Sequence, residues 1–128
     1  MHRSRLAALV IDSLVDDIGP AAEFWGKALG REPVKSDEDC LSKYVHLDVR
    51  KEEVRVLIQK VDHPSRVHLD IETDNIEAEV RRLEALGAKI VKVMERWTVM
   101  EAPTGHRFCV VNPQRPDFQE SEDVNIWS

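Results

Sequence analysis

The chain has 128 residues and a formal net charge of −6, a length that suits one ordinary domain. Its 42% hydrophobic residues can fill a core and its 33% charged residues can cover a surface, which excludes a disordered chain, collagen and a disulfide scaffold. The acidic balance argues against nucleic acid as a partner, because phosphate binding needs a basic surface.

The first apolar run, Leu6–Ile11, predicts a short buried strand. The run is too short for a signal-peptide core and far short of the roughly 20 residues that span a membrane. The two cysteines, Cys40 and Cys109, are expected to be free thiols, since the chain shows no export signal. We therefore expect a cytoplasmic protein with no membrane partner.

A first module is predicted as one strand, one helix and three further strands. The helix is expected at Asp17–Gly30, where Trp25 lies on the apolar face and Gly30 suits the end. The strands are expected at Arg31–Lys35, Lys43–Val49 and Glu53–Val61, with a polar turn at Ser36–Cys40. Asp62–Ser65 is the only plausible linker.

A second module repeats this order. Arg66–Glu72 alternates, with Val67, Leu69 and Ile71 on one face and His68, Asp70 and Glu72 on the other. Asp74 is expected to cap a helix that ends at Gly87 and buries Ile76, Val80, Leu83 and Leu86. Three strands follow at Ala88–Val93, Arg96–Met100 and His106–Val111, the last two joined by a turn at Ala102–Gly105.

An offset of about 57 residues aligns Asp17 with Asp74 and Leu29-Gly30 with Leu86-Gly87. We therefore predict the α+β class, with two tandem βαβββ modules at about 5–61 and 66–112. The modules are expected to pair into a cupped mixed sheet with helices on the outside, because neither buries its own second sheet face. Residues 1–128 would form a single domain, and the tail 113–128 would lie over the surface, anchored by Phe118 and Trp127.

This order and several short motifs resemble the vicinal oxygen chelate superfamily of glyoxalase I, bleomycin-resistance proteins and extradiol dioxygenases. The resemblance covers nearly the whole chain and is closest to small proteins with a glyoxalase-like domain. The motifs are Ala22-Glu23-Phe24-Trp25, Val67-His68-Leu69-Asp70, Trp97-Thr98-Val99-Met100 and the run from Pro103 to Val110.

The resemblance implies a cupped sheet that holds a divalent metal through His, Gln or Glu from the first and last strands of each module. His68 matches the ligand position on the first strand of the second module, and Gln59 is the candidate on the last strand of the first. The first module offers only Ile11 or Leu9 at the position equivalent to His68, and neither side chain can bind a metal. Cys109 stands where the family often has Glu.

His68 and Gln59 are therefore weak metal candidates, and the residues quoted for the metal positions include no carboxylate. We expect no cofactor; the alternative is a divalent zinc, nickel, manganese or iron ion. The catalytic residues stay unassigned, since Glu72 and Glu101 match none of the family's ligand positions.

Five residues are candidates for ligand contact in the cup. Trp97 would suit a planar or apolar ligand, and His46 could act as an acid or base near neutral pH. Cys109 would be a buried thiol or, beside Arg107, a reactive one. The set is completed by His68 and Gln59.

Two functions stay open. The first is a binding protein of the bleomycin-resistance type that holds a small molecule in the cup, with a degraded or absent metal site. The alternative is a metal-dependent lyase, isomerase or dioxygenase of the glyoxalase I type, so enzyme status is undecided. A ferredoxin-like ligand-sensing module is disfavoured because this chain offers one helix per four strands. A homodimer is possible on the resemblance alone.

Overall fold

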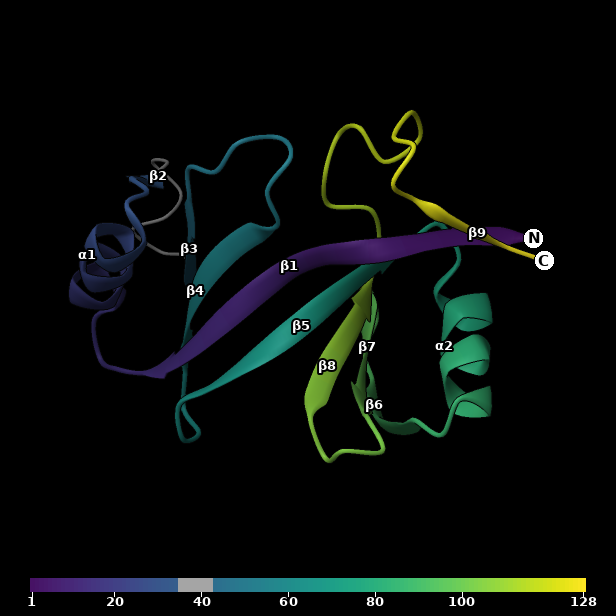
Figure 1. Ribbon diagram of the computed structural model, residues 1–128. Coiled ribbons are helices and arrows are strands. Elements are labelled where there is room, and N and C mark those ends of the chain that lie inside the picture. The colour runs from purple at the N-terminus through teal and green to yellow at the C-terminus, as the bar shows by residue number, and fades with distance from the viewer. Residues whose placement is uncertain (35–42) are drawn as a thin grey trace. The chain divides into compact units, whose positions relative to one another are not determined.

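The computed structural model describes residues 1–34 and 43–128 (Figure 1). The turn expected at Ser36–Cys40, and Cys40 with it, lie outside the described residues. Within these described residues nine strands and two helices form, and the α+β class is confirmed. The strand, helix, three-strand order occurs twice, as expected. The chain divides into two compact units, here called the N-terminal unit (Ala8–Val67) and the C-terminal unit (Met1–Ala7 with His68–Ser128).

The N-terminal unit contains most of β1 (His2–Leu14) followed by one helix and three strands. These are α1 (Ile18–Leu29), β2 (Pro33–Val34), β3 (Tyr44–Leu47) and β4 (Arg55–Val61). The strand order is β2-β3-β4-β1, with β4 parallel to β1 and the other neighbours antiparallel. Figure 1 shows α1 beside β2–β4.

Helix α1 begins and ends as its sequence predicts. The Asp17 carboxylate accepts a hydrogen bond from the Gly19 amide at 2.9 Å, and Gly30 adopts a left-handed φ of 69°. The predicted buried face is wrong, because the residues that α1 buries are Ala22 and Gly26. A Cβ atom at Gly26 would lie 2.7 Å from the Arg31 carbonyl oxygen, so the helix packs through its smallest residues and leaves Trp25 partly exposed.

The C-terminal unit contains the second module and the tail. Its elements are β5 (Arg66–Thr73), α2 (Ile76–Ala85), β6 (Lys89–Val93), β7 (Trp97–Glu101), β8 (Arg107–Val111) and β9 (Asn125–Trp127). The strand order is β5-β8-β7-β6, with β5 parallel to β8. Helix α2 covers one face of this sheet (Figure 1). The core beneath it is formed by Val80, Leu83, Ala88, Met100, Phe108 and Val110.

Two expectations about α2 are wrong. Asn75, not Asp74, caps the helix, because its side chain accepts a hydrogen bond from the Ala78 amide at 3.0 Å. Asp74 instead accepts one from the Arg3 amide at 2.8 Å. Leu86 is 67% exposed because it follows the last helical turn rather than continuing the buried stripe.

The C-terminal tail is tied to the start of the chain. Strand β9 pairs antiparallel with His2–Ser4 of β1, so both termini lie together in Figure 1. Phe118 is buried, and the Trp127 indole donates a hydrogen bond to the Ser4 hydroxyl at 2.8 Å. Neither described helix is long and apolar enough to cross a lipid bilayer.

Candidate functional site

The sheet of the C-terminal unit has one face covered by α2 and one face turned away from it. Along β8, Phe108 and Val110 are buried in the α2 core, while the side chains that alternate with them point to the other face. The same alternation in β7 places Met100 in that core and leaves Trp97 and Val99 on the opposite face. We call this opposite face of β5-β8-β7-β6 the open face.

Three side chains with metal-ligating atoms meet on the open face. Asp70 of β5 and Cys109 of β8 are direct register partners, and His68 precedes Asp70 by two residues on the same side of β5. One ligating atom from each of the three lies within 4.8 Å of the other two. The His68 Nε2 atom lies 3.3 Å from an Asp70 carboxylate oxygen.

This cluster is partly exposed. The side chains of His68 and Asp70 are 12% and 19% exposed, and Cys109 is likewise only partly buried. The surrounding residues therefore hold these three side chains in place, and the exposed part of each remains accessible to a small molecule or an ion. An imidazole, a carboxylate and a thiol together can exchange protons or coordinate a cation.

The five predicted contact residues fall into two sets. Trp97, His68 and Cys109 all belong to the C-terminal unit. Trp97 is the first residue of β7, and 38% of its surface is exposed. Gln59 and His46 belong to the N-terminal unit, on neighbouring strands β4 and β3. There Gln59 is the register partner of Tyr44 and His46 that of Leu57, so both lie on one sheet face.

Glu72 shares the open face with His68 and Asp70, but it is buried and held by basic groups. Its carboxylate accepts hydrogen bonds from Arg5 Nε at 2.7 Å, from Arg115 Nε at 3.1 Å and from the backbone amides of Gln114 and Arg115. Burial alone would raise the pKa of Glu72, but the hydrogen bonds from Arg5 and the 114–115 backbone outweigh it and lower the pKa. Glu72 is therefore a structural anion and not a proton acceptor for a ligand.

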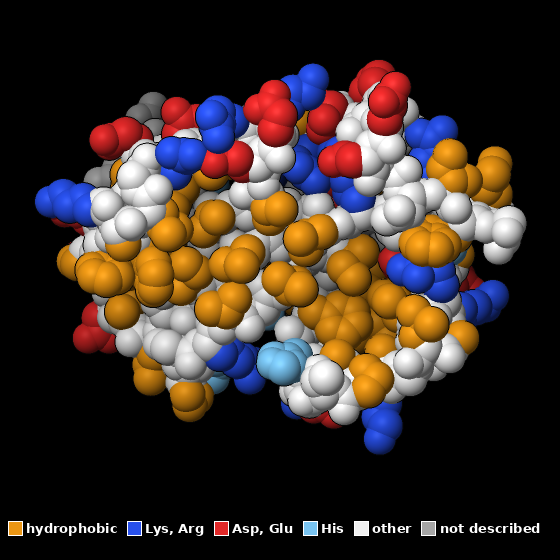
Figure 2. Space-filling view, viewed as in Figure 1, with side chains coloured by type: hydrophobic (Ala, Val, Ile, Leu, Met, Phe, Trp, Pro, Cys, Tyr) orange, Lys and Arg blue, Asp and Glu red, His pale blue; other side chains and the backbone are white. Residues whose placement is uncertain are grey.

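Arg5 extends this network to the tail. Its guanidinium, 4% exposed, also donates to Asp117 at 2.8 Å and to Asp123 at 2.6 Å. Figure 2 shows acidic and basic side chains side by side where Figure 1 draws the C-terminal segment in yellow. The tail residues 114–123 are thus anchored to the C-terminal unit through ion pairs with the buried Arg5 and hydrogen bonds to the buried Glu72.

Asp70 was not among the predicted site residues, although a signal for it exists. The helix caps Asp17 and Asn75 align the two modules at an offset of 58, which places Asp12 on Asp70. Asp12 is the register partner of Gln59, just as Asp70 is the register partner of Cys109. The assumed cap at Asp74 shifted this alignment by one residue and hid the equivalence.

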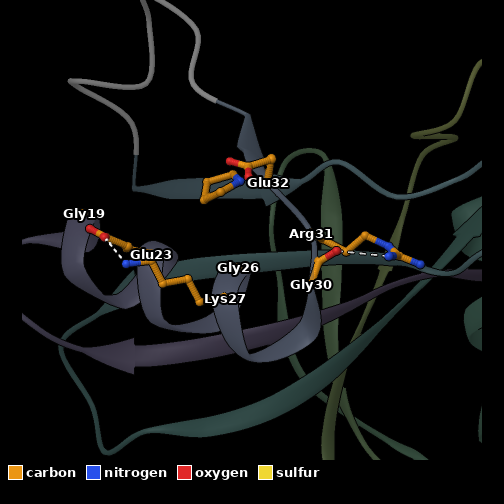
Figure 3. Close-up of a pocket in the computed structure, with 8 residues that line it drawn as sticks. Gly19, Glu23, Gly26, Lys27, Gly30, Arg31 and Glu32 are labelled. Carbon is orange, nitrogen blue, oxygen red and sulfur yellow. Dashed lines mark hydrogen bonds and ion pairs between the residues drawn. The ribbon is translucent and has the colours of Figure 1, made fainter.

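A separate pocket of about 590 Å³ lies in the N-terminal unit and contains none of the predicted site residues. Figure 3 shows it along α1 and the turn that follows, with Gly19, Gly26 and Gly30 contributing backbone. Its basic groups already have acidic partners, Lys27 with Glu23 and Arg31 with Glu53. This pocket therefore offers a ligand no spare basic group among the residues that line it.

Comparisons with known proteins agree with this architecture. Residues 8–111 match the model of a family described as "Glyoxalase-like domain". A search of curated protein sequences finds no match.

Three solved structures illustrate the likeness. Methylmalonyl-CoA epimerase from Mycobacterium tuberculosis is 15% identical, with a TM-score of 0.60 over 86% of this chain and 88% of that one. A glyoxalase/bleomycin resistance protein/dioxygenase superfamily member from Vibrio splendidus 12B01 is 17% identical, with a TM-score of 0.53 over 86% and 99%. An extradiol ring-cleaving dioxygenase from B. fuscum is 12% identical, with a TM-score of 0.57 over 87% and 33%. At these identities the likeness shows the fold alone.

Proposed function

Because the chain belongs to the glyoxalase-like domain family, we propose that it binds a small molecule on the open face through a divalent cation held by His68, Asp70 and Cys109. The single observation that carries this proposal is the convergence of the three ligating side chains from β5 and β8 within 4.8 Å. The names of the structural neighbours, an epimerase and a dioxygenase, support a ligand of low molecular weight.

The residues present fit a cation of the zinc type. Zinc accepts imidazole nitrogen, carboxylate oxygen and thiolate sulfur at about 2.0 to 2.3 Å, which places ligand atoms roughly 3.3 to 3.8 Å apart. The three ligating atoms, all within 4.8 Å of one another, lie near that spacing. Three protein ligands with a fourth position left for another molecule is the pattern of catalytic rather than structural zinc sites.

The argument for a metal-free protein was the lack of a carboxylate among His68, Gln59 and Cys109. Asp70 supplies that carboxylate, so the geometry favours the metal-dependent alternative. A bound cation would supply Lewis-acid polarisation of a ligand oxygen. Whether that polarisation serves a lyase, isomerase or dioxygenase reaction depends on groups that the cluster itself does not include.

Cobalt(II) titration of the full chain tests the proposal, because a cobalt–thiolate bond gives an intense near-ultraviolet charge-transfer band. We expect the band to saturate at one equivalent of cobalt and to vanish in Cys109→Ser. His68→Ala and Asp70→Asn should each weaken cobalt binding by about tenfold or more, because each removes one of three ligands.

Two control variants keep this test specific. Cys40→Ser removes the other thiol of the chain, and His46→Ala removes a histidine of the N-terminal unit; both should leave the band unchanged. A wild-type protein without a thiolate band at stoichiometric cobalt, or a band that survives in Cys109→Ser, would refute the proposal. Thermal unfolding of each variant confirms that it is folded.

A second candidate, a metal-free binding protein, is favoured by one contact. His68 Nε2 lies 3.3 Å from an Asp70 carboxylate oxygen, so these two side chains interact with each other without a cation. In that case the partly exposed His68–Asp70 pair would contact a polar ligand directly, with no cation between them. The same cobalt titration separates the candidates, since this one predicts no stoichiometric thiolate band.

A further inference from the structure

The open face carries an ordered set of side chains around the cluster. The antiparallel register of β7 and β8 pairs Glu101 with Arg107, Val99 with Cys109 and Trp97 with Val111. Successive pairs on one face lie about 6.6 Å apart along the strands. Cys109 and its neighbour Val99 therefore lie between an ionic pair on one side and an aromatic-aliphatic pair on the other.

Arg107 is accessible and only loosely paired. Its Nε atom lies 3.5 Å from a Glu101 carboxylate oxygen, and the two side chains are 38% and 39% exposed. An ion pair this long and this exposed contributes little to stability, so exchanging Glu101 for a ligand carboxylate costs little. A guanidinium binds a carboxylate through two parallel hydrogen bonds, which gives such an exchange a geometric advantage.

The charge of the open face favours an anion. The register places Lys89 beside Glu101 and Lys92 beside Val99, so both lysines lie on the open face next to the β7 residues already described. With Arg107 they give three basic side chains against the carboxylates of Asp70 and Glu101, because the third carboxylate of the face, Glu72, is already paired with Arg5 and Arg115. This local excess contrasts with the net charge of −6 of the whole chain and would attract small anions to the sheet.

The other end of the face is apolar. Trp97 is 38% exposed, and Val99 and Val111 are each only partly buried. A partly exposed indole flanked by two valines provides a flat apolar surface of the kind that binds planar groups.

We infer that the ligand of the open face is a small carboxylic acid with a planar apolar group, its carboxylate on Arg107 and its apolar part over Val99 toward Trp97. The inference rests on the proposed function, because it assigns the ligand class of the same site. In this orientation the atoms between carboxylate and apolar group pass over Cys109, where the ligating cluster lies.

Isothermal titration calorimetry of the zinc-loaded full chain with 3-phenylpropanoate and its uncharged analogue 3-phenylpropanamide tests this assignment. We expect the acid to bind about tenfold or more tightly than the amide, as a charge-assisted pair predicts. Arg107→Gln should abolish that preference, Arg107→Lys should keep part of it, and Trp97→Ala should weaken binding of both probes.

Arg81→Gln is the matched control, because Arg81 is an exposed arginine on α2 paired with Glu77. Equal binding of acid and amide, no binding of either, or an acid preference that survives in Arg107→Gln would overturn the inference. The cobalt band of the same preparations separates this failure from that of the proposed function. If the cobalt–thiolate band is normal but the acid and the amide bind equally, only the assigned ligand class is refuted. If the band is missing but the acid still binds more tightly than the amide, only the proposed metal site is refuted.

Discussion

Glu72 is the residue on which the C-terminal unit depends most for its charged contacts. The carboxylate is fully buried and joins β5 to Arg5 of β1 and to the backbone of 114–115. A buried carboxylate of this kind is costly to desolvate, so its hydrogen-bond partners must be complete for the fold to tolerate it. The remaining donors to Glu72 come from the tail, from the backbone amides of Gln114 and Arg115 and from the Arg115 side chain.

We predict that Glu72→Gln lowers the free energy of unfolding by about 3 kcal/mol at pH 7, because it removes the buried anion that Arg5 and Arg115 share. The pKa of Glu72 is lower in the folded state than its ordinary value of 4.5. Its stabilisation is therefore fully present above about pH 4.5 and is lost as pH falls through the folded-state pKa.

Urea unfolding of wild type and Glu72→Gln at several pH values measures this difference. The two proteins should converge in stability under acidic conditions. Glu77→Gln, which breaks an exposed pair with Arg81 on α2, should change stability by no more than about 0.5 kcal/mol. A Glu72→Gln effect as small as that of Glu77→Gln would show that the buried network is not stabilising.

Among the secondary-structure elements, both helices were predicted in the right place, but the cap of α2 and the buried face of α1 were wrong. Apolar periodicity located both, but it placed Trp25 in the core where Ala22 and Gly26 are buried. The periodic pattern identifies the most hydrophobic face of a helix. In α1, however, the buried face is the one where the segment after the helix, at Arg31 and Pro33, comes within contact distance of Gly26. Strand β9 was not predicted, since its three residues carry no periodic signal and form only by pairing with β1.

The cap of α2 gives a test at this scale. Asn75→Ala should destabilise the protein by about 1 kcal/mol, because the Ala78 amide loses its side-chain acceptor. Asn75→Asp should be nearly neutral, since aspartate accepts the same hydrogen bond. Chemical denaturation monitored by circular dichroism measures both variants. If Asn75→Ala has the same free energy of unfolding as wild type, the start of α2 is not stabilised by this cap.

At the scale of the whole molecule, internal repetition was the most informative feature of the sequence. It predicted the α+β class and the repeated βαβββ order, both of which are confirmed. The candidate site was predicted in part, because His68, Cys109 and Trp97 share the open face of the C-terminal unit. Asp70 was missed because the assumed module alignment was off by one residue, and because its position beside Cys109 depends on the strand register between β5 and β8.

The same limit applies to the tail. No local sequence pattern pairs Asp117 and Asp123 with Arg5, and only the folded chain brings this buried arginine to them. Long-range ion pairs between residues more than one hundred positions apart leave no periodic trace. They nevertheless determine where the tail meets the sheet.

The proposed function requires that His68, Asp70 and Cys109 hold a divalent cation on the open face. X-ray absorption at the zinc K edge, on the full chain with one equivalent of zinc, tests it most directly. We predict one sulfur neighbour at about 2.3 Å with nitrogen and oxygen neighbours at about 2.0 to 2.2 Å, and loss of the sulfur neighbour in Cys109→Ser. A wild-type spectrum with nitrogen and oxygen neighbours alone would contradict the claim.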